Sequence, residues 1–577
     1  MFKLFRFLKP YKKELILGPA FKVLEAIFEL LVPLVMKKII DVGVKNQDSK
    51  YVLTHGLIIL ALGLIGFCST LVCQYLASAA SQGTGTVLRK ELFKHINSFS
   101  CKELDKFSSS KLLTRLTSDI NQIQLAVASL IRLTIRVPLL IIGAIIMSFT
   151  IDSKLAIVIL VISPIISGII WLVMNKAFPQ FKKVQTSLEK VVQSTSENLV
   201  GMRVIRAFNA EEDQISRFNE NAEELSGHYK KATMLSSIQG PLTALVVNFG
   251  IIAILWQGAF RVDTGALTQG GIIALVNYMT QINIALVAAA KLVDTFIKAG
   301  ASASRINEVF DTVPSITYGS EEAAAESTEA VSLNDVSFSY AGLKNAVSGI
   351  NLNIEKGSTY GIVGGTGSGK STLVSLIARF YEAETGDVML FGKNIDKYSF
   401  DALKKTVCLC PQKAAVLSGD VRYNISLASS SKTDDELIEA LKVAQAYDFV
   451  MQKGGLDAIL EENGKNLSGG QKQRISLARA IASDAKIMIF DDCFSALDAA
   501  TEKALRSALR ERAEKNGTTI IIISQNVRSV RSCDKICVLD AGICVGVGTH
   551  DELLTSCHEY AEIFSSQNRG DDSNEKA

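Results

Sequence analysis

The apolar residues of this chain are concentrated in its first half, in long runs separated by polar segments. A helix that spans a bilayer needs about 20 mostly apolar residues. Segments of that kind lie at roughly 15–37, 54–79, 129–150, 155–176, 243–262 and 270–296. The third and fourth are nearly unbroken, whereas Lys22, Glu25 and Glu29 interrupt the first. The pattern predicts an α-helical membrane region with six transmembrane helices.

The connections between these segments alternate in length and in charge. Those after the second and fourth segments are long and rich in basic residues, among them Arg89, Lys94, Lys182 and Arg203. Lys and Arg near span ends favour the cytoplasmic side. The N-terminus, residues 1–13, is basic and amphipathic, which predicts a helix on the inner membrane surface. We therefore expect both termini and both long links in the cytoplasm, at a cell (plasma) membrane that the chain crosses several times.

The hydrophobic pattern changes character after the sixth segment. Within the long links, 184–199 and 211–225 have apolar residues three and four apart, so the spans are expected to continue as helices into the cytoplasm. From Val331, short β-branched runs alternate with glycine turns and helical stretches, which predicts an α/β domain. The predicted organisation is a membrane domain at 1–315, a linker at 316–330, an α/β domain at 331–568 and a polar tail at 569–577.

Composition and charge narrow the class of partner. The net charge of +3 gives no polyelectrolyte signal, so nucleic acid is not expected as a partner, whereas a lipid bilayer is. The ten cysteines follow no repeated short spacing. Buried or free thiols in a reducing cytosol are therefore the favoured interpretation, over a metal or disulfide site.

The first functional motif of the α/β domain is a phosphate-binding loop. Residues 364–371 read GGTGSGKS and match G-x-x-x-x-G-K-[ST], between an apolar strand at 359–363 and a helical run at 372–380. Its backbone N–H groups and the helix N-terminus are suited to phosphates, with Lys370 reaching the β/γ-phosphates of ATP and Ser371 ligating Mg²⁺. The predicted nucleotide-binding residues are Gly364, Gly365, Thr366, Gly367, Ser368, Gly369, Lys370, Ser371 and Thr372.

Two later motifs complete this picture. The apolar strand 487–491 ends in Asp491, which is predicted to hold Mg²⁺, through water. The residues Leu467-Ser-Gly-Gly-Gln471 resemble the signature of ABC transporters, and the resemblance extends over essentially the whole chain. It implies a P-loop ATPase domain of the ABC type fused to its membrane domain.

Further positions follow from this resemblance. In the family two nucleotide domains meet head to tail, so Ser468, Gly469, Gly470 and Gln471 would contact the ATP held by the partner's loop. Tyr340 matches the aromatic residue that stacks on adenine, although a core or edge-strand tyrosine is the alternative. Gln412 matches the glutamine that senses Mg²⁺, and Asp498 belongs to the loop that touches the opposite site.

The membrane half resembles the exporter type of ABC transporter. Residues 197–209 are close to the family's pattern in the second long link, which leads into a short helix docked on the partner's nucleotide domain. The first long link, around 104–118, would supply the other docking helix. Fusion of the two domains disfavours an importer.

Two catalytic positions depart from the family pattern. Asp492 stands where a glutamate usually polarises the attacking water, and Gln525 stands where a histidine is usual. Aspartate is one methylene shorter, and glutamine cannot carry the charge of His⁺. These substitutions indicate a site that binds ATP and hydrolyses it slowly, although a working variant site is the alternative.

The signature, in contrast, is intact, and a signature serves the partner's ATP. The chain thus resembles the degenerate-site subunit of bacterial heterodimeric multidrug exporters, whose partner would be a second ABC half-transporter carrying glutamate and histidine at these positions. A homodimer with two slow sites and an ATP-gated regulator or channel are the alternatives.

The charges in the first segment bear on the transported substrate. Lys22, Glu25 and Glu29 share one helix face, and charges within a membrane should face protein or water. Glu25 and Glu29 line a cavity for small amphipathic cations, or, as the alternative, Lys22 and Glu25 form a structural ion pair. Amphipathic, multidrug-like compounds or lipids are the expected cargo.

Overall fold

The computed structural model describes residues 2–322, 327–340, 345–429 and 431–574, with side chains from 3 to 567. Parts of the predicted linker, 323–326, and of the predicted tail, 575–577, lie outside the described residues. The chain divides into two compact units. The first comprises Met1–Asn97 and Ser108–Thr312, and the second comprises Ser98–Phe107 and Val313–Ala577.

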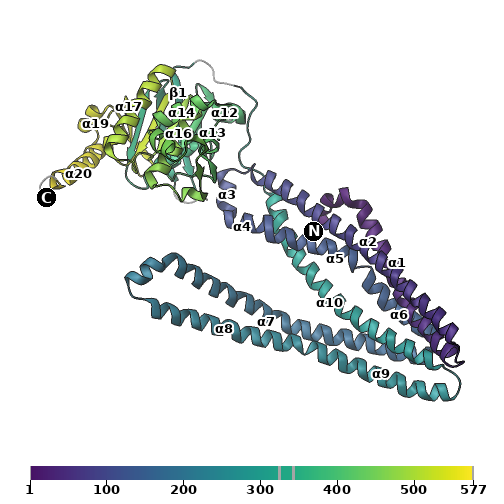
Figure 1. The fold of residues 1–577 in the computed structure, drawn as a ribbon. Coiled ribbons are helices and arrows are strands. Elements are labelled where there is room, and N and C mark those ends of the chain that lie inside the picture. The colour runs from purple at the N-terminus through teal and green to yellow at the C-terminus, as the bar shows by residue number, and fades with distance from the viewer. Residues whose placement is uncertain (1, 323–326, 341–344, 430, 575–577) are drawn as a thin grey trace. The chain divides into compact units, whose positions relative to one another are not determined.

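The first unit is helical throughout (Figure 1). Its main helices are α1 (Lys12–Lys38), α2 (Ser49–Ile96), α4 (Ser109–Thr114), α5 (Ile120–Arg132), α6 (Arg136–Ile151), α7 (Ser153–Ala207), α8 (Glu211–Ser237), α9 (Gln239–Asp263) and α10 (Gln269–Asp311). The continuous helices α7 and α8 confirm that the spans extend well beyond their apolar segments.

Five helical stretches among the described residues are long and apolar enough to cross a membrane. They begin at Ser49, Ser109, Ser153, Glu211 and Gln269, and they contain the second to sixth predicted segments. The first predicted segment forms α1, which is helical but is interrupted by Lys22, Glu25 and Glu29 and is not among these five stretches. The helical membrane region is thus confirmed, and its charged residues set α1 apart from the other predicted spans.

The core of the membrane unit lies between α1, α6, α7, α9 and α10. Tyr278 on α10 is fully buried there, and its hydroxyl donates to the carbonyl of Leu30 on α1 at 2.7 Å. A buried hydroxyl needs such a partner, because leaving it unpaired costs about 1–3 kcal/mol. This bond therefore fixes α10 against α1 in an otherwise apolar core.

Two local predictions for this unit can be compared with the structure. Residues Phe2–Tyr11 form the predicted N-terminal helix, as a 3₁₀ helix, and its Leu4 and Leu8 are buried against the protein's own helices. The short docking helix expected after 197–209 is not a separate element, since a turn at residues 208–210 joins α7 directly to α8. Because the backbone hydrogen bonds of α7 continue to Ala207 and those of α8 begin at Glu211, only this turn remains between the two helices.

The second unit contains the predicted α/β domain (Figure 1). One sheet has the strand order β12-β11-β3-β10-β9-β6, and a second sheet has the order β2-β1-β4-β5. The strands are β1 (Glu329–Ser339), β2 (Asn345–Glu355), β3 (Thr359–Gly364), β4 (Thr385–Leu390), β5 (Lys393–Asn394), β6 (Val407–Cys410), β7 (Gly419–Asp420), β8 (Ile459–Leu460), β9 (Ile487–Asp491), β10 (Thr519–Ser524), β11 (Lys535–Asp540) and β12 (Ile543–Gly548).

The six-stranded sheet is parallel except for its edge strand β12. Strands β9 and β10 are buried along their whole length, which explains their unbroken apolar sequences. The helices are α3 (Cys101–Phe107), α11 (Lys370–Ile377), α12 (Phe400–Thr406), α13 (Val421–Ser426), α14 (Asp434–Val443), α15 (Tyr447–Gln452), α16 (Gly469–Ala482), α17 (Ala499–Asn516), α18 (Val527–Val530), α19 (His550–Ser556) and α20 (His558–Asn574).

The short helix α3 lies in the first long link yet folds with the second unit. Tyr381 donates its hydroxyl hydrogen to Asp105 at 2.5 Å, and the hydroxyls of Ser100 and Ser315 are 2.8 Å apart. A helix at this place was expected from the sequence as a docking helix. These contacts attach it to the nucleotide-domain fold of its own chain.

Asp119 provides a test of how the membrane unit is held together. Its buried carboxylate accepts from Ser302 Oγ and Arg305 Nε, each at 2.9 Å, and so joins the start of α5 to α10. Because these bonds are charge-assisted, Asp119→Ala should lower the stability of the unit by about 2 kcal/mol, seen as a lower Tm in detergent.

Asp294→Ala, which breaks an exposed pair with Lys298 on α10, is the control and should change the stability of the unit by less than about 0.5 kcal/mol. Equal effects of the two substitutions would contradict this assignment.

Candidate functional site

The phosphate-binding loop connects β3 to α11, as the sequence predicts. Gly369 has φ +95°, a conformation that side chains rarely adopt, and a Cβ there would lie 2.5 Å from the carbonyl oxygen of Ala346. A Cβ on Gly364 would lie 2.2 Å from the carbonyl oxygen of Leu539. The loop therefore runs against neighbouring backbone where only glycine fits, and α11 begins directly after it.

Lys370 lies folded into this loop. Its ammonium donates to the carbonyl oxygens of Gly364 at 2.9 Å and Gly365 at 2.6 Å. Burial lowers the pKa of Lys370, while the nearby Asp491 and Asp492 carboxylates act in the opposite direction. The buried cation thus sits at the centre of the loop, where a polyphosphate would offer stronger acceptors than the carbonyls do.

An acidic pair faces this lysine from the end of β9. Ser371 Oγ donates to Asp491 Oδ1 at 3.3 Å, and Gln412 Nε2 donates to Asp492 Oδ2 at 3.1 Å. Burial raises the pKa of both carboxyl groups. Asp492 has φ +47°, and its N–H donates to the carbonyl of Ile523 on β10 at 2.9 Å, which fixes its position. The serine, the glutamine and the two carboxylates present a surface rich in hard oxygen atoms.

Gln525 follows β10 and reaches the loop from that strand. Its Oε1 accepts from Thr366 Oγ1 at 3.4 Å. A cavity of about 260 Å³ connects all of these groups, and its lining consists of Ala346, Thr366, Gly367, Ser368, Gly369, Lys370, Ser371, Thr372, Gln412, Asp491, Asp492 and Gln525. The fold thus brings together the loop, both acids and both residues that depart from the family pattern.

Tyr340 lies at the end of β1, beside the start of α11. Its hydroxyl is 3.3 Å from Thr372 Oγ1, and its ring packs edge-on against Phe338 and Tyr381. The side chain stays 36% exposed. An aromatic ring held next to a phosphate loop and still open to solvent has what stacking on a base requires.

The signature residues occupy a helix start elsewhere in the unit. Ser468 caps α16, accepting from the N–H of Gln471 at 3.3 Å, while Gln471 Oε1 accepts from the N–H of Ser468 at 3.0 Å. Gly469 and Gly470 form the first turn, whose N–H groups suit an anion. Asp498 caps α17 through Thr501, and these bonds lower the pKa of Asp498.

None of these five signature and cap residues is among the described residues that line the cavity. The cavity of one chain therefore holds the loop and the acids without its own signature. This is the arrangement expected if a second nucleotide domain completes the site.

The charges of α1 are paired inside the membrane unit. Lys22 Nζ lies 2.5 Å from Glu25 Oε2, and Arg136 on α6 lies 2.9 Å from Glu29 Oε2 and 3.8 Å from Glu25 Oε1. Arg136 was not singled out from the sequence, because it belongs to another predicted span than Glu25 and Glu29. Neutralised in this way, Glu25 and Glu29 fit the structural alternative better than a cation-binding surface.

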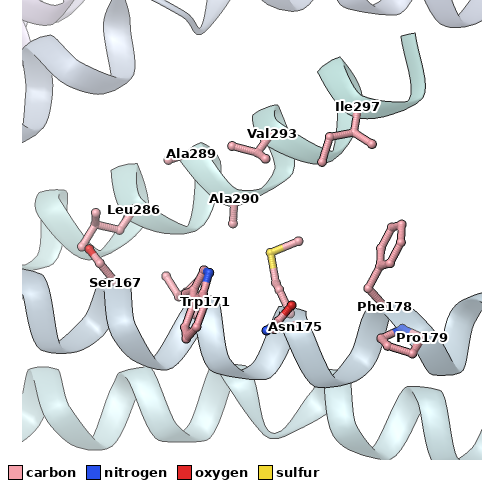
Figure 2. Close-up of a pocket in the computed structure, with 12 residues that line it drawn as sticks. Ser167, Trp171, Asn175, Phe178, Pro179, Leu286, Ala289, Ala290, Val293 and Ile297 are labelled. Carbon is pink, nitrogen blue, oxygen red and sulfur yellow. The ribbon is translucent and has the colours of Figure 1, made fainter. Parts of the chain in front are cut away.

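A second cavity, which sequence reasoning missed, lies between α7 and α10 and has a volume of about 470 Å³. Figure 2 shows Trp171 and Phe178 extending from α7 toward α10, whose Ala290 points back at them. The lining is almost entirely apolar, with Asn175 and Ser167 as polar exceptions. Its residues belong to two long apolar helices, where the sequence pattern marks none of them as special.

Comparison with known proteins agrees with this architecture. The family model of the ABC transporter transmembrane region matches residues 15–286, and a second family model, described as ABC transporter, matches residues 347–495. The chain is 33% identical, over 98% of both chains, to the uncharacterized ABC transporter ATP-binding protein YfiB of Bacillus subtilis. It is 30% identical, over 97% of this chain and 96% of the relative, to an ATP-dependent lipid A-core flippase of Salmonella typhimurium.

The fold also matches a solved structure. A bacterial Atm1-family ABC exporter with ATP bound superposes with a TM-score of 0.79 over 98% of both chains, at 21% identity. Matches to both domains in order, together with relatives that share the full length, establish the family. The chain belongs to the ABC transporters, as an exporter-type half-transporter whose helical transmembrane region is fused to a nucleotide-binding ATPase domain.

Proposed function

We propose that this chain is the slow-site subunit of a heterodimeric ABC exporter that moves amphipathic compounds or lipids across the cell membrane. One observation carries the proposal. The two residues that depart from the family's catalytic pattern, Asp492 and Gln525, both line the cavity formed by the phosphate loop. Their chemistry weakens hydrolysis, while the phosphate loop with Lys370 keeps the residue types that bind a nucleotide.

The binding roles follow from the site's geometry. Lys370 exchanges its carbonyl acceptors for the β- and γ-phosphates, and Tyr340 stacks on adenine. Ser371, Gln412 and Asp491 provide oxygen ligands suited to Mg²⁺, which keeps several waters and needs few protein groups. When bound, Mg²⁺ neutralises charge on the β/γ-phosphate oxygens. Burial raises the pKa of Asp491, and a bound cation would favour the charged form of this carboxyl group.

The slow step follows from two side chains. Asp492 is a methylene shorter than glutamate and is held at 3.1 Å by Gln412, so its carboxylate stops short of the position from which glutamate orients water. An error of about 1 Å there can cost about 100-fold in rate. Gln525 can donate a hydrogen bond to a γ-phosphate but adds no positive charge. ATP would then stay bound and hold the nucleotide domains together.

The intact signature supports the heterodimer. Ser468 and Gln471 form a capping box at the start of α16, and neither residue lines the phosphate-loop cavity of its own chain among the described residues. ABC exporters act as dimers in a membrane, and the first turn of this helix would complete the competent site of a partner that carries glutamate and histidine. Asp498, at the start of α17, would contact that site. Closure on ATP would turn the membrane cavity outward, and hydrolysis at the partner's site would reset it.

The substrate class is inferred from the cavity between α7 and α10. A volume of about 470 Å³ with apolar walls and a single amide, Asn175, fits the tail and linker of an amphiphile. A relative named as a lipid flippase supports the same class. The nucleotide domain and both termini would lie in the cytoplasm of a bacterial cell. A homodimer with two slow sites is the second candidate.

ATP hydrolysis by the purified chain tests the slow site. We expect low activity for the wild-type chain alone and a rise of about 10- to 100-fold for Asp492→Glu, because the longer carboxylate reaches the attacking water. Lys370→Ala added to Asp492→Glu is the control, and it should abolish the gain. Brisk activity of the wild-type chain alone would overturn the slow-site assignment and favour the homodimer.

The cavity between α7 and α10 can be tested with tryptophan fluorescence. The chain has two tryptophans, so Trp256→Phe leaves Trp171 as the reporter in the cavity wall. In nanodiscs, a spin-labelled phospholipid should quench Trp171 saturably, whereas Trp171→Phe, which keeps Trp256 on α9, should show only linear quenching. Ala290→Trp, a change that fills the cavity, should abolish the saturable transport of a fluorescent phospholipid. Linear quenching of both tryptophans would contradict the assignment.

A further inference from the structure

Two cysteines meet on the hairpin that ends the six-stranded sheet. Cys537 lies on β11 and Cys544 on the edge strand β12, and their sulfur atoms are 3.2 Å apart. Leu539 pairs with Cys544 while Val538 pairs with Gly546, so the strand register shifts between these two pairs. Since side chains alternate along a strand, Cys537, Leu539 and Cys544 share one face of the sheet.

The two thiols differ in ways that suit a reactive pair. Cys537 is fully buried, whereas Cys544 is partly exposed at the sheet edge. The hydrogen bond from Cys537 lowers the pKa of Cys544 to about 7, and it correspondingly raises the pKa of Cys537. Thiolate is the reactive form of cysteine, so Cys544 is the nucleophile and Cys537 the resolving thiol.

We propose that Cys537 and Cys544 form an oxidation site, which peroxides convert to an intrachain disulfide that weakens ATP binding. The Cys544 thiolate attacks one peroxide oxygen, the O–O bond breaks, and Cys544 becomes a sulfenic acid while the second oxygen leaves as water after protonation. The Cys537 sulfur then attacks the Cys544 sulfur, the S–O bond breaks, and a second water leaves. Two thiols are oxidised and one peroxide is reduced.

The hairpin connects this pair to the nucleotide site. Gly542, in the turn between β11 and β12, donates its N–H to the carbonyl of Ser368 in the phosphate loop at 3.2 Å. The carbonyl of Leu539 lies so close to Gly364 that a Cβ there would be 2.2 Å away. Closing the sulfur distance from 3.2 Å to about 2.05 Å draws β11 and β12 toward each other at these residues, and we expect the loop that they support to shift with them. Displacement of about 1 Å is enough to spoil a positioned site.

Mass spectrometry of the full-length chain in nanodiscs tests the site. After hydrogen peroxide and alkylation of the remaining thiols, the tryptic peptide 536–569, which contains both cysteines, should lose the mass of two hydrogen atoms. Cleavage before Asp540, which lies between the two cysteines, should then leave two fragments joined by a disulfide. The reaction should speed up as the pH rises through about 7, because Cys544 ionises there beside Cys537 and Tyr360.

Single substitutions identify the partners. Cys537→Ser should leave a sulfenic acid at Cys544 that dimedone traps, and Cys544→Ser should leave Cys537 unreacted. The matched control is Cys557→Ser, which removes the third thiol of the same peptide. Cys557 lies beside Gly546 of β12, where a Cβ would be 3.1 Å from its sulfur atom. This substitution should leave the disulfide unchanged. A disulfide through Cys557, or none at all, would overturn the oxidation site.

Binding of a fluorescent ATP analogue tests the coupling to the phosphate loop. Oxidation should weaken the affinity of the wild-type chain about tenfold, and dithiothreitol should restore it, whereas Cys544→Ser should bind equally before and after peroxide. Unchanged affinity of a chain that carries the Cys537–Cys544 disulfide would overturn the coupling. Reduced wild-type chain and reduced Cys544→Ser should bind alike, which separates oxidation from misfolding.

Discussion

The nucleotide unit depends on the buried ammonium group of Lys370, for which its own chain supplies only weak hydrogen-bond acceptors. Lys370 is almost fully buried, and it donates to the backbone carbonyls of Gly364 and Gly365. An ionised group removed from water costs several kcal/mol unless strong acceptors replace its hydration. Asp491 and Asp492 act on the ammonium through their charge, and the neutral carbonyls are weaker acceptors than an anion would be. A triphosphate resolves this imbalance, which is why the loop is suited to bind nucleotide.

This requirement explains the surrounding architecture. Parallel strands place their carboxyl ends at one edge of the sheet, so acids that follow another strand of the sheet can face a lysine buried at the end of β3. Strand β9 provides Asp491 and leads into Asp492, and β10 provides the carbonyl of Ile523 that fixes Asp492 through its N–H. A shortened carboxylate on such a fixed backbone cannot move forward to compensate. The position of Asp492 thus follows from the sheet, and its reach follows from its length.

The sequence was most informative where local chemistry determines structure. The phosphate loop, the strand ending in Asp491 and the helix starting at Gly469 all lie where their motifs predict, because glycine conformations, buried strands and helix caps are local properties. The pairing of Glu29 with Arg136 was out of reach, since the two residues lie on different helices more than a hundred positions apart. The turn at residues 208–210 was also missed, because continuous helical periodicity does not reveal where one helix ends without a proline or glycine.

The charged residues around α1 and the apolar cavity between α7 and α10 have opposite consequences for the binding of a substrate. Lys22, Glu25, Glu29 and Arg136 have a net charge of zero and neutralise one another, so α1 can remain in the membrane unit despite its charged residues. A cationic substrate would have to break these ion pairs before it could use the carboxylates, at a cost of about 3–5 kcal/mol for each charge left unpaired. The cavity between α7 and α10 imposes no such cost, because Trp171, Phe178 and Val293 need no partner beyond apolar contact. The free energy of binding at this wall would scale with the apolar area of the ligand, which agrees with the proposed amphiphilic substrates.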